Sequence, residues 1–169
     1  MNSETKDLSL QLYESIRAGN VDEVISIIGN GVDINKSAHC PIPLIAAAQD
    51  GQTQIVKSLL AVDGIEVNYH MPNGRTALHY AALLEDMMIM KLLLRAGADP
   101  AMKDCHGNTP CDLSPWSATR RYLTWLMVMT PQERDERLNP QKYAEPPSNR
   151  WIGKPLYAPV VAFNKELPS

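Results

Sequence analysis

Cysteine is scarce in this sequence, and no cysteine stands in a pairing or metal-binding pattern. The 169 residues include three cysteines, Cys40, Cys105 and Cys111, an odd number without a CxxC spacing. Such a set is typical of free thiols in a reducing compartment rather than of a disulfide framework. We therefore expect a cytoplasmic protein, with the nucleus as the alternative compartment.

Segments for targeting, membrane insertion or nucleic-acid binding are also missing. The N-terminal MNSETKDLSL has no basic stretch followed by an apolar one, which a secretory signal requires. No run approaches the roughly 18 apolar residues of a transmembrane helix. Lysine and arginine run no longer than the pair Arg120-Arg121, and the formal net charge is −3. The sequence thus predicts no nucleic-acid partner and no membrane partner.

What the sequence does contain is a repeat with a period of about 33 residues. TALHYAA at residues 76–82 aligns with TPCDLSP at 109–115 and with IPLIAAA at 42–48. Between them, GQTQIVKSLL at 51–60 aligns with EDMMIMKLLL at 85–94. The first segment predicts a short helix with small residues, and the second a helix with apolar residues at helical spacing. Neither helix can bury its apolar face alone, so the units must stack into a solenoid.

This period and the Thr-x-Leu-His-x-Ala pattern resemble the ankyrin repeat family. The resemblance covers roughly residues 8–116. It implies an all-α ankyrin-repeat solenoid with three full repeats, a modified C-terminal capping repeat and a Pro-rich C-terminal extension. We expect an ankyrin domain over residues 1–130, followed by a short helix and an extended segment over residues 131–169. The expected repeats lie at about 8–36, 37–70, 71–103 and 104–130.

Some residues depart from the repeat pattern. Glu85 stands where other repeats have a glycine, which predicts either a strained left-handed residue or a longer helix. Pro115 falls inside the expected first helix of the last repeat and must end that helix. Ser114 and Pro115 then predict the start of a new helix over about residues 115–129. The segment Thr130-Pro131-Gln132-Glu133 predicts a capping box for one more helix.

His79 raises the question of chemistry, because it could be a general base, a metal ligand or part of the scaffold. No nucleophile motif accompanies it. The pairs His39-Cys40 and Cys105-His106 should lie about 20 Å apart, too far to share one zinc ion. We therefore expect no catalytic residue, no cofactor and no metal site. The resemblance implies structural roles at helix starts, and the residues expected in such roles are Thr76, His79, Thr109 and Pro110.

Recognition of another protein is the function that remains. Ankyrin-like stacks bind partners with their turn tips and the concave face of the first helices. The resemblance therefore implies a non-catalytic protein–protein interaction module that acts as an adaptor or steric inhibitor. Exposed leucine at Leu83 or Leu84, with polar neighbours, predicts an interface core with a polar rim. The expected contact residues are Arg17, His39, Gln49, Asp50, His70, Asn73, Arg75, Leu83, Leu84, Lys103, His106, Asn108, Trp151 and Tyr157.

The segment after Pro131 is rich in proline and yet carries aromatic and aliphatic residues. Such side chains gain about 1.5–3 kcal/mol each when fully buried. We expect the segment to dock, either on a partner or on the chain's own last helix, where Tyr122, Trp125, Leu126 and Met129 form one stripe. The alternative function is an assembly or targeting subunit or domain of a larger enzyme or transporter complex, with this segment as the subunit contact. Homo-oligomerisation through residues 131–169 is not favoured.

Overall fold

The computed structural model describes residues 3–35 and 42–139, and side chains from residue 8 onward. Within these ranges the chain is helical, and no strand is present. Some predictions fall outside the described residues. They concern the contact residues His39, Trp151 and Tyr157 and the Pro-rich extension.

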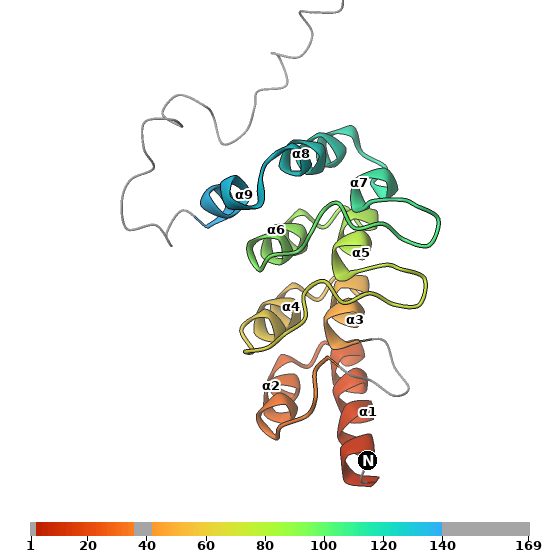
Figure 1. Cartoon of the computed structure of the whole chain (residues 1–169). Coiled ribbons are helices and arrows are strands. Elements are labelled where there is room, and N and C mark those ends of the chain that lie inside the picture. Colours follow the sequence, from red (N-terminus) through yellow and green to blue (C-terminus); the bar gives the residue numbers. More distant parts are fainter. Residues whose placement is uncertain (1–2, 36–41, 140–169) are drawn as a thin grey trace, which may run out of the picture.

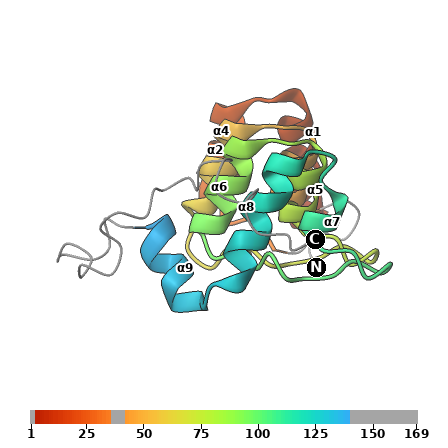
Figure 2. The same cartoon turned by 90° about the horizontal axis from the view of Figure 1, so that it is seen from above.

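The helices form two layers along one axis (Figure 1). The first helices of the repeats are α1 (Ser3–Ala18), α3 (Pro43–Gln49), α5 (Ala77–Leu83) and α7 (Pro110–Leu113). Beside them lie the second helices α2 (Val21–Gly29), α4 (Thr53–Leu60) and α6 (Met87–Arg95). The chain continues with α8 (Ser117–Val128) and α9 (Pro131–Leu138). Seen from above, α8 lies across the end of the stack and α9 lies at its side (Figure 2).

Contacts between helices follow the order of a solenoid. Helix α3 packs between α1 and α5, α5 also packs on α7, and α4 packs between α2 and α6. Buried alanines in α3 and α5 let neighbouring first helices approach closely. The predicted all-α stack of repeats is therefore confirmed. The largest fully buried side chains are Leu12, Ile16, Leu44, Ile45, Ile55, Leu59, Leu78, Ile89, Met90, Leu93, Leu123 and Leu126.

The first helices α1, α3 and α5 are each followed by a left-handed residue. Gly19 and Gly51 have φ angles of 72° and 67°, a region in which glycine pays no steric penalty. Glu85 takes the same position after α5 with a φ of 58°. Glu85 is therefore a left-handed residue, which was one of the two alternatives, and α5 ends at Leu83.

The last helices follow the sequence signals with one correction. Helix α7 ends at Leu113, ahead of Pro115, as predicted. The next helix begins at Ser117, so the predicted start at Pro115 is wrong by two residues. Ser114 is held extended by the following proline, and its hydroxyl donates to the Glu85 carboxylate instead of capping a helix.

Helix α9 matches its prediction. Thr130 and Glu133 form the expected capping box, in which each side chain accepts the other residue's backbone N–H. Asn139 then fastens the end of α9 to the stack, because its Nδ2 donates to the Arg95 carbonyl at 3.0 Å. On α8, the stripe expected to receive the C-terminal segment is partly covered already. Leu126 is buried, and the Arg137 guanidinium lies 5.2 Å from the Trp125 ring centroid.

Candidate protein-binding surface

His79 is completely buried at the start of α5. Its Nδ1 accepts the Thr76 N–H at 3.1 Å and lies 2.9 Å from Thr76 Oγ1. Because a backbone N–H can only donate, the ring proton sits on Nε2, which donates to the Asn108 carbonyl at 3.2 Å. Burial lowers the pKa of His79 below its ordinary 6.5, so the ring is neutral at pH 7. Both ring nitrogens are therefore engaged, and neither is directed at a substrate or metal site.

Thr109 and Pro110 begin α7 in a related way. Asp112 Oδ2 accepts both the Thr109 N–H at 2.8 Å and the Thr109 hydroxyl at 2.7 Å. Thr109 Oγ1 in turn accepts the Asp112 N–H. Pro110 occupies the first turn, where its missing N–H costs no hydrogen bond. These contacts form a capping box that stabilises the start of α7.

Asp104 is a buried residue that the sequence did not single out. Its Oδ1 accepts the N–H groups of His106 at 2.9 Å and Asn108 at 3.0 Å, and its Oδ2 lies 3.4 Å from Arg75 Nε. Burial alone would raise the pKa of Asp104, but these hydrogen bonds outweigh it and lower the pKa to about 2. An aspartate three residues before a turn glycine, Gly107, is a signal that could have identified it.

The turn residues predicted as contacts divide into two groups. Asn73, Arg75 and Asn108 are half-buried and hold the turns together. Asn73 accepts the Arg75 N–H and donates to the Tyr80 hydroxyl, whereas Arg75 pairs with Asp104. The side chains that remain exposed at the tips are His70, Lys103 and His106.

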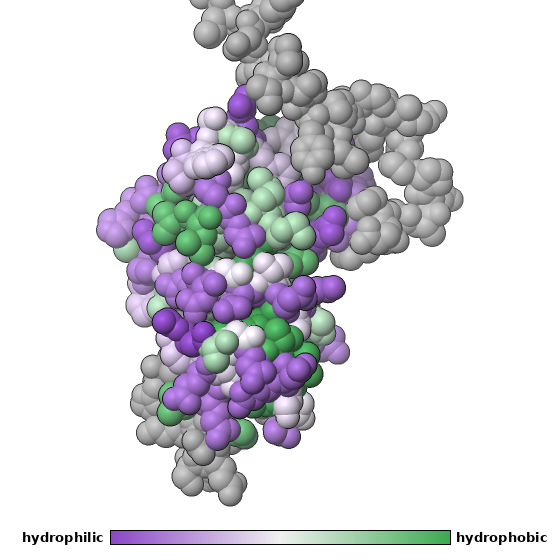
Figure 3. All heavy atoms as spheres, turned by 180° about the vertical axis from the view of Figure 1, so that it is seen from behind, coloured by the Kyte–Doolittle hydropathy of each residue, from purple (hydrophilic) through white to green (hydrophobic). Residues whose placement is uncertain are grey.

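The ends of the first helices carry the other predicted contacts. Gln49 and Asp50 are exposed at the end of α3, and Asp50 pairs with Arg17 of α1 at 3.3 Å. Leu83 and Leu84 are 44% and 51% exposed at the end of α5. The structure thus brings Arg17 and Asp50 together, and it leaves the two leucines open to solvent. Seen from behind, apolar side chains gather in separate patches among hydrophilic ones (Figure 3).

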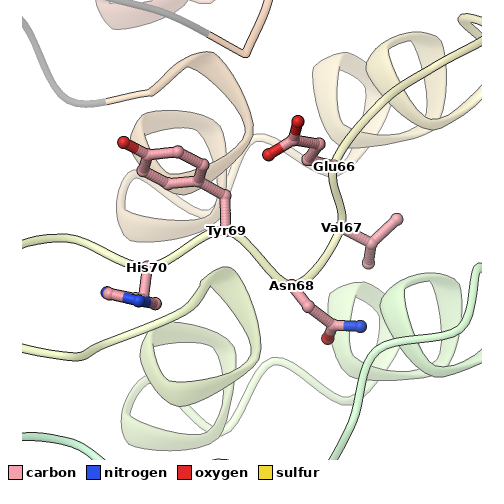
Figure 4. Close-up of a pocket in the computed structure, with 5 residues that line it drawn as sticks. All are labelled: Glu66, Val67, Asn68, Tyr69 and His70. Atoms are coloured by element: carbon pink, nitrogen blue, oxygen red, sulfur yellow. The ribbon is translucent and has the colours of Figure 1, made fainter.

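One shallow hollow lies beside the turn after α4 (Figure 4). It is lined by five consecutive residues, Glu66, Val67, Asn68, Tyr69 and His70, whose side chains point in different directions. The Asn68 amide is occupied, because it donates to the Gly97 carbonyl and accepts the Asp99 N–H. A small-molecule site needs polar groups that converge on one volume. This hollow therefore favours no substrate or cofactor.

A metal site and a membrane-spanning helix each have requirements that the described part of the chain can be compared with. No three His, Cys, Asp or Glu side chains come together there as metal ligands. Over the same residues, no helix is both long and apolar enough to cross a bilayer. Cys105 and Cys111 are free thiols.

A family model of ankyrin repeats (3 copies) matches residues 12–104, more than half of the chain. The chain belongs to the ankyrin repeat family. Ankyrin repeats are in general non-catalytic modules for protein–protein interaction, and the similar proteins point to no enzyme.

Its relatives are longer proteins that contain ankyrin repeats. The B-cell lymphoma 3 protein homolog of Mus musculus is 33% identical over 115 residues, which cover 62% of this chain and 25% of the relative. Regulatory protein NPR6 of Arabidopsis thaliana is 33% identical over 90 residues, with 53% and 18% covered. SH3 and multiple ankyrin repeat domains protein 1 of Homo sapiens is 30% identical over 110 residues, with 63% and 5% covered. The chain therefore spans a quarter or less of the length of these ankyrin-repeat relatives.

Trp116 is an exposed residue of this ankyrin stack that the sequence reasoning missed. It is 68% exposed between α7 and α8, and its N–H donates to Glu85 Oε1 at 3.0 Å. This bond links the residue before α8 to the side chain of the residue two positions after the end of α5. A tryptophan outside the aligned repeat positions, after a helix-ending proline, is the signal that could have identified it.

Proposed function

We propose that this ankyrin-repeat protein acts as an adaptor or steric inhibitor that binds another protein with its turn tips and the concave ends of its first helices. The observation that carries the proposal is the pair Leu83 and Leu84, exposed at the end of α5 in the middle of the stack. Large apolar side chains exposed side by side, with a polar rim, are typical of interfaces. His70, Lys103 and His106 supply polar groups at the neighbouring tips.

The mechanism we propose is steric and depends on a preformed surface. Arg75, Asp104 and His79 are fixed by hydrogen bonds between successive repeats, so binding needs little reordering of the turns. A surface that is already ordered loses less conformational entropy when a partner binds. Such a surface can hold a partner in place or cover one of the partner's own sites. In this proposal Thr76, His79, Thr109 and Pro110 are structural residues, and residues 104–130 form a modified cap.

The test begins with crosslinking of the intact protein to its partners in cells and identification of those partners by mass spectrometry. The purified partner is then titrated against the wild type and against Leu83→Arg/Leu84→Arg by calorimetry. We expect the affinity to fall by at least about tenfold, because two apolar contacts are replaced by charges. The thermal midpoint should not change, since both side chains are exposed.

The matched control is Val128→Arg, which places the same charge at a side chain that is 83% exposed on α8. This control should bind like the wild type. An affinity for Leu83→Arg/Leu84→Arg equal to that of the control would remove Leu83 and Leu84 from the proposed interface.

The second candidate function is assembly or targeting within a larger complex. One observation favours it: in the relatives, the matching repeats are a quarter or less of a larger protein. The subunit contact in this hypothesis lies in residues 131–169. Of these residues, α9 packs on α6 of the same chain. Analytical ultracentrifugation of the full-length protein, with Trp151→Ala/Tyr157→Ala as the comparison, tests whether a stable complex depends on this segment.

A further inference from the structure

Glu85 joins the third repeat to the start of α8 through one carboxylate. Its oxygens accept hydrogen bonds from the Ser114 hydroxyl, the Trp116 N–H and the Thr119 hydroxyl. All three donors lie in the short stretch from the end of α7 to the first turn of α8. Ser114 and Thr119 are only 1% and 3% exposed, so water cannot easily replace Glu85 as the partner of their hydroxyl groups.

The backbone at Glu85 indicates that this link is a specific feature of the chain. Its φ angle of 58° is one that a residue with a Cβ seldom adopts, and Gly19 and Gly51 follow the first helices of the two earlier repeats. A strained residue persists where the surrounding contacts hold it in place. At position 85 those contacts are the three bonds to the carboxylate, which a glycine could not make.

Helices α8 and α9 are fastened to each other by two arginines of α9. Arg134 Nε donates to the Leu126 carbonyl at the end of α8, at 3.2 Å. The Arg137 guanidinium lies 5.2 Å from the ring centroid of Trp125, which also belongs to α8. We call these two helices together the 117–138 unit.

The 117–138 unit lies at one end of the stack, with the described repeats on one side of it (Figure 2). Its main helix contacts with the repeats are α8 on the four-residue helix α7 and α9 on α6. Leu123 and Leu126 of α8 are fully buried, so the unit is closed in the folded protein. Each part of a stack contacts only its neighbours. A unit at the end therefore breaks fewer contacts when it opens than a repeat in the middle does.

Cys111 of α7 is covered by α8. Its Sγ lies 3.4 Å from the Arg120 carbonyl oxygen and 3.2 Å from Thr124 Oγ1, and the residue is only 7% exposed. Both of these partners belong to α8, so movement of α8 away from α7 would admit solvent to the thiol. Cys105, by contrast, is already exposed in the folded protein.

We propose that the 117–138 unit opens as one body while the repeats stay folded, and that the Glu85 carboxylate is the latch that keeps it closed. In the open state the three donors lose their acceptor, Leu123 and Leu126 leave the core, and Cys111 becomes accessible. Parts of native proteins can open cooperatively at a lower cost in free energy than global unfolding. This inference concerns the conformation of the chain, and it stands whether or not the repeats bind their partner through α5.

The test is labelling of the intact protein with N-ethylmaleimide, followed by digestion and mass spectrometry of the peptides that contain each thiol. In the wild type we expect fast labelling of Cys105 and slow labelling of Cys111. Glu85→Ala should speed the labelling of Cys111 by about tenfold or more, because it removes three hydrogen bonds from the closed state. Glu85→Gln should give a smaller increase, since its amide oxygen can still accept from Ser114 and Trp116.

Hydrogen exchange of the wild type tests the same opening without a substitution. The protected amides of α8 and α9 should exchange at one common rate, because the two helices open together. That rate should exceed the rate for the protected amides of α4 and α6, which stay folded in the open state.

Two controls match the Glu85 variants. Asp50→Asn neutralises the carboxylate that pairs with Arg17 at the end of α3, one repeat earlier. It should leave the labelling of Cys111 unchanged. Ile16→Val removes one methyl group from a fully buried side chain of α1 and so destabilises the far end of the stack. It should favour global unfolding and yet leave the labelling of Cys111 unchanged.

Three outcomes would overturn the inference. Labelling of Cys111 that Ile16→Val speeds as strongly as it favours global unfolding would show that the thiol reacts only in the unfolded chain. Equal labelling rates in the wild type and Glu85→Ala would show that the carboxylate is not a latch. Exchange rates that differ between α8 and α9, or that equal those of α4 and α6, would show that the 117–138 unit does not open as one body.

Discussion

Glu85 offers the sharpest test of how this stack is held together. It has a φ angle of 58° at a position where Gly19 and Gly51 end the first helices of other repeats. Left-handed backbone costs a residue with a Cβ about 1–2 kcal/mol. A comparison of the repeats alone therefore predicts that Glu85→Gly stabilises the protein by about that amount.

The contacts of the Glu85 carboxylate predict the opposite. Three donors from the last repeat bond to it, namely the Ser114 and Thr119 hydroxyls and the Trp116 N–H. Each bond to a charged group contributes about 1.5–3 kcal/mol when buried. Glu85 itself is partly exposed, so we take about 1 kcal/mol for each bond, with a further ~1 kcal/mol for the two buried hydroxyls that lose their acceptor. The loss of about 4 kcal/mol exceeds the relief of strain, and Glu85→Gly should destabilise by about 2 kcal/mol.

Urea unfolding followed by circular dichroism measures the difference. The corresponding fall in thermal midpoint is about 4–8 °C for a chain of this size. Glu85→Ala is the matched control, because it removes the same carboxylate but keeps the strained φ angle. It should be less stable than Glu85→Gly by about 1 kcal/mol. A Glu85→Gly protein more stable than the wild type would show that the link between α5 and α8 contributes less than the backbone strain costs.

The remaining predictions concern the other links between repeats. His79→Ala should lower the free energy of unfolding by about 1–3 kcal/mol, because Thr76 and Asn108 lose a buried partner; denaturant titration measures this, and unchanged stability would contradict the hydrogen-bond assignment. Because the folded pKa of His79 lies below its ordinary 6.5, the unfolded chain binds the proton more readily, and stability should fall as the pH drops below 6.5. The fall of stability with decreasing pH should be less steep in His79→Ala than in the wild type. An equally steep fall in both proteins would refute the neutral ring of His79. For Asp104 the folded pKa of about 2 lies below the ordinary 3.8. Its contribution to the free energy of unfolding should therefore be present above pH 3.8 and be lost as the pH falls through 2. In Asp104→Asn the thermal midpoint should depend less on pH between these two values. Arg75→Glu should destabilise the fold as well as alter the surface, because it places two carboxylates together, whereas Leu83→Arg should leave the thermal midpoint unchanged.

The repeats and most helices could be predicted because their signals are local and periodic. Apolar spacing, the glycines after first helices and the capping box at Thr130 and Glu133 each depend on a few neighbouring residues. The start of α8 could not be predicted in this way. Ser114 would cap a helix at Pro115 by local rules, but its hydroxyl bonds to Glu85, which lies 29 residues earlier in the chain. A tertiary hydrogen bond therefore decided the helix boundary.

The candidate surface was predictable only in part for the same reason. The exposure of Leu83 and Leu84 could be predicted because their place in the repeat fixes which face of α5 they occupy. Asn73 and Arg75 share a turn with exposed residues, yet their side chains are used between repeats, and this depends on Asp104 in the next repeat. Repeat position thus predicts where a residue lies, and it cannot predict which polar groups remain free.

Some polar groups bond between repeats and others stay exposed, and this follows from the one-dimensional architecture of the stack. In a stack, each repeat contacts only its neighbours, so every turn must be fixed by bonds to the next turn. Arg75, Asp104 and His79 make such bonds in the second half of the stack. Specific recognition then depends on the exposed side chains that do not take part in these bonds between repeats. In this chain the large apolar side chains that remain exposed include Leu83, Leu84 and Trp116.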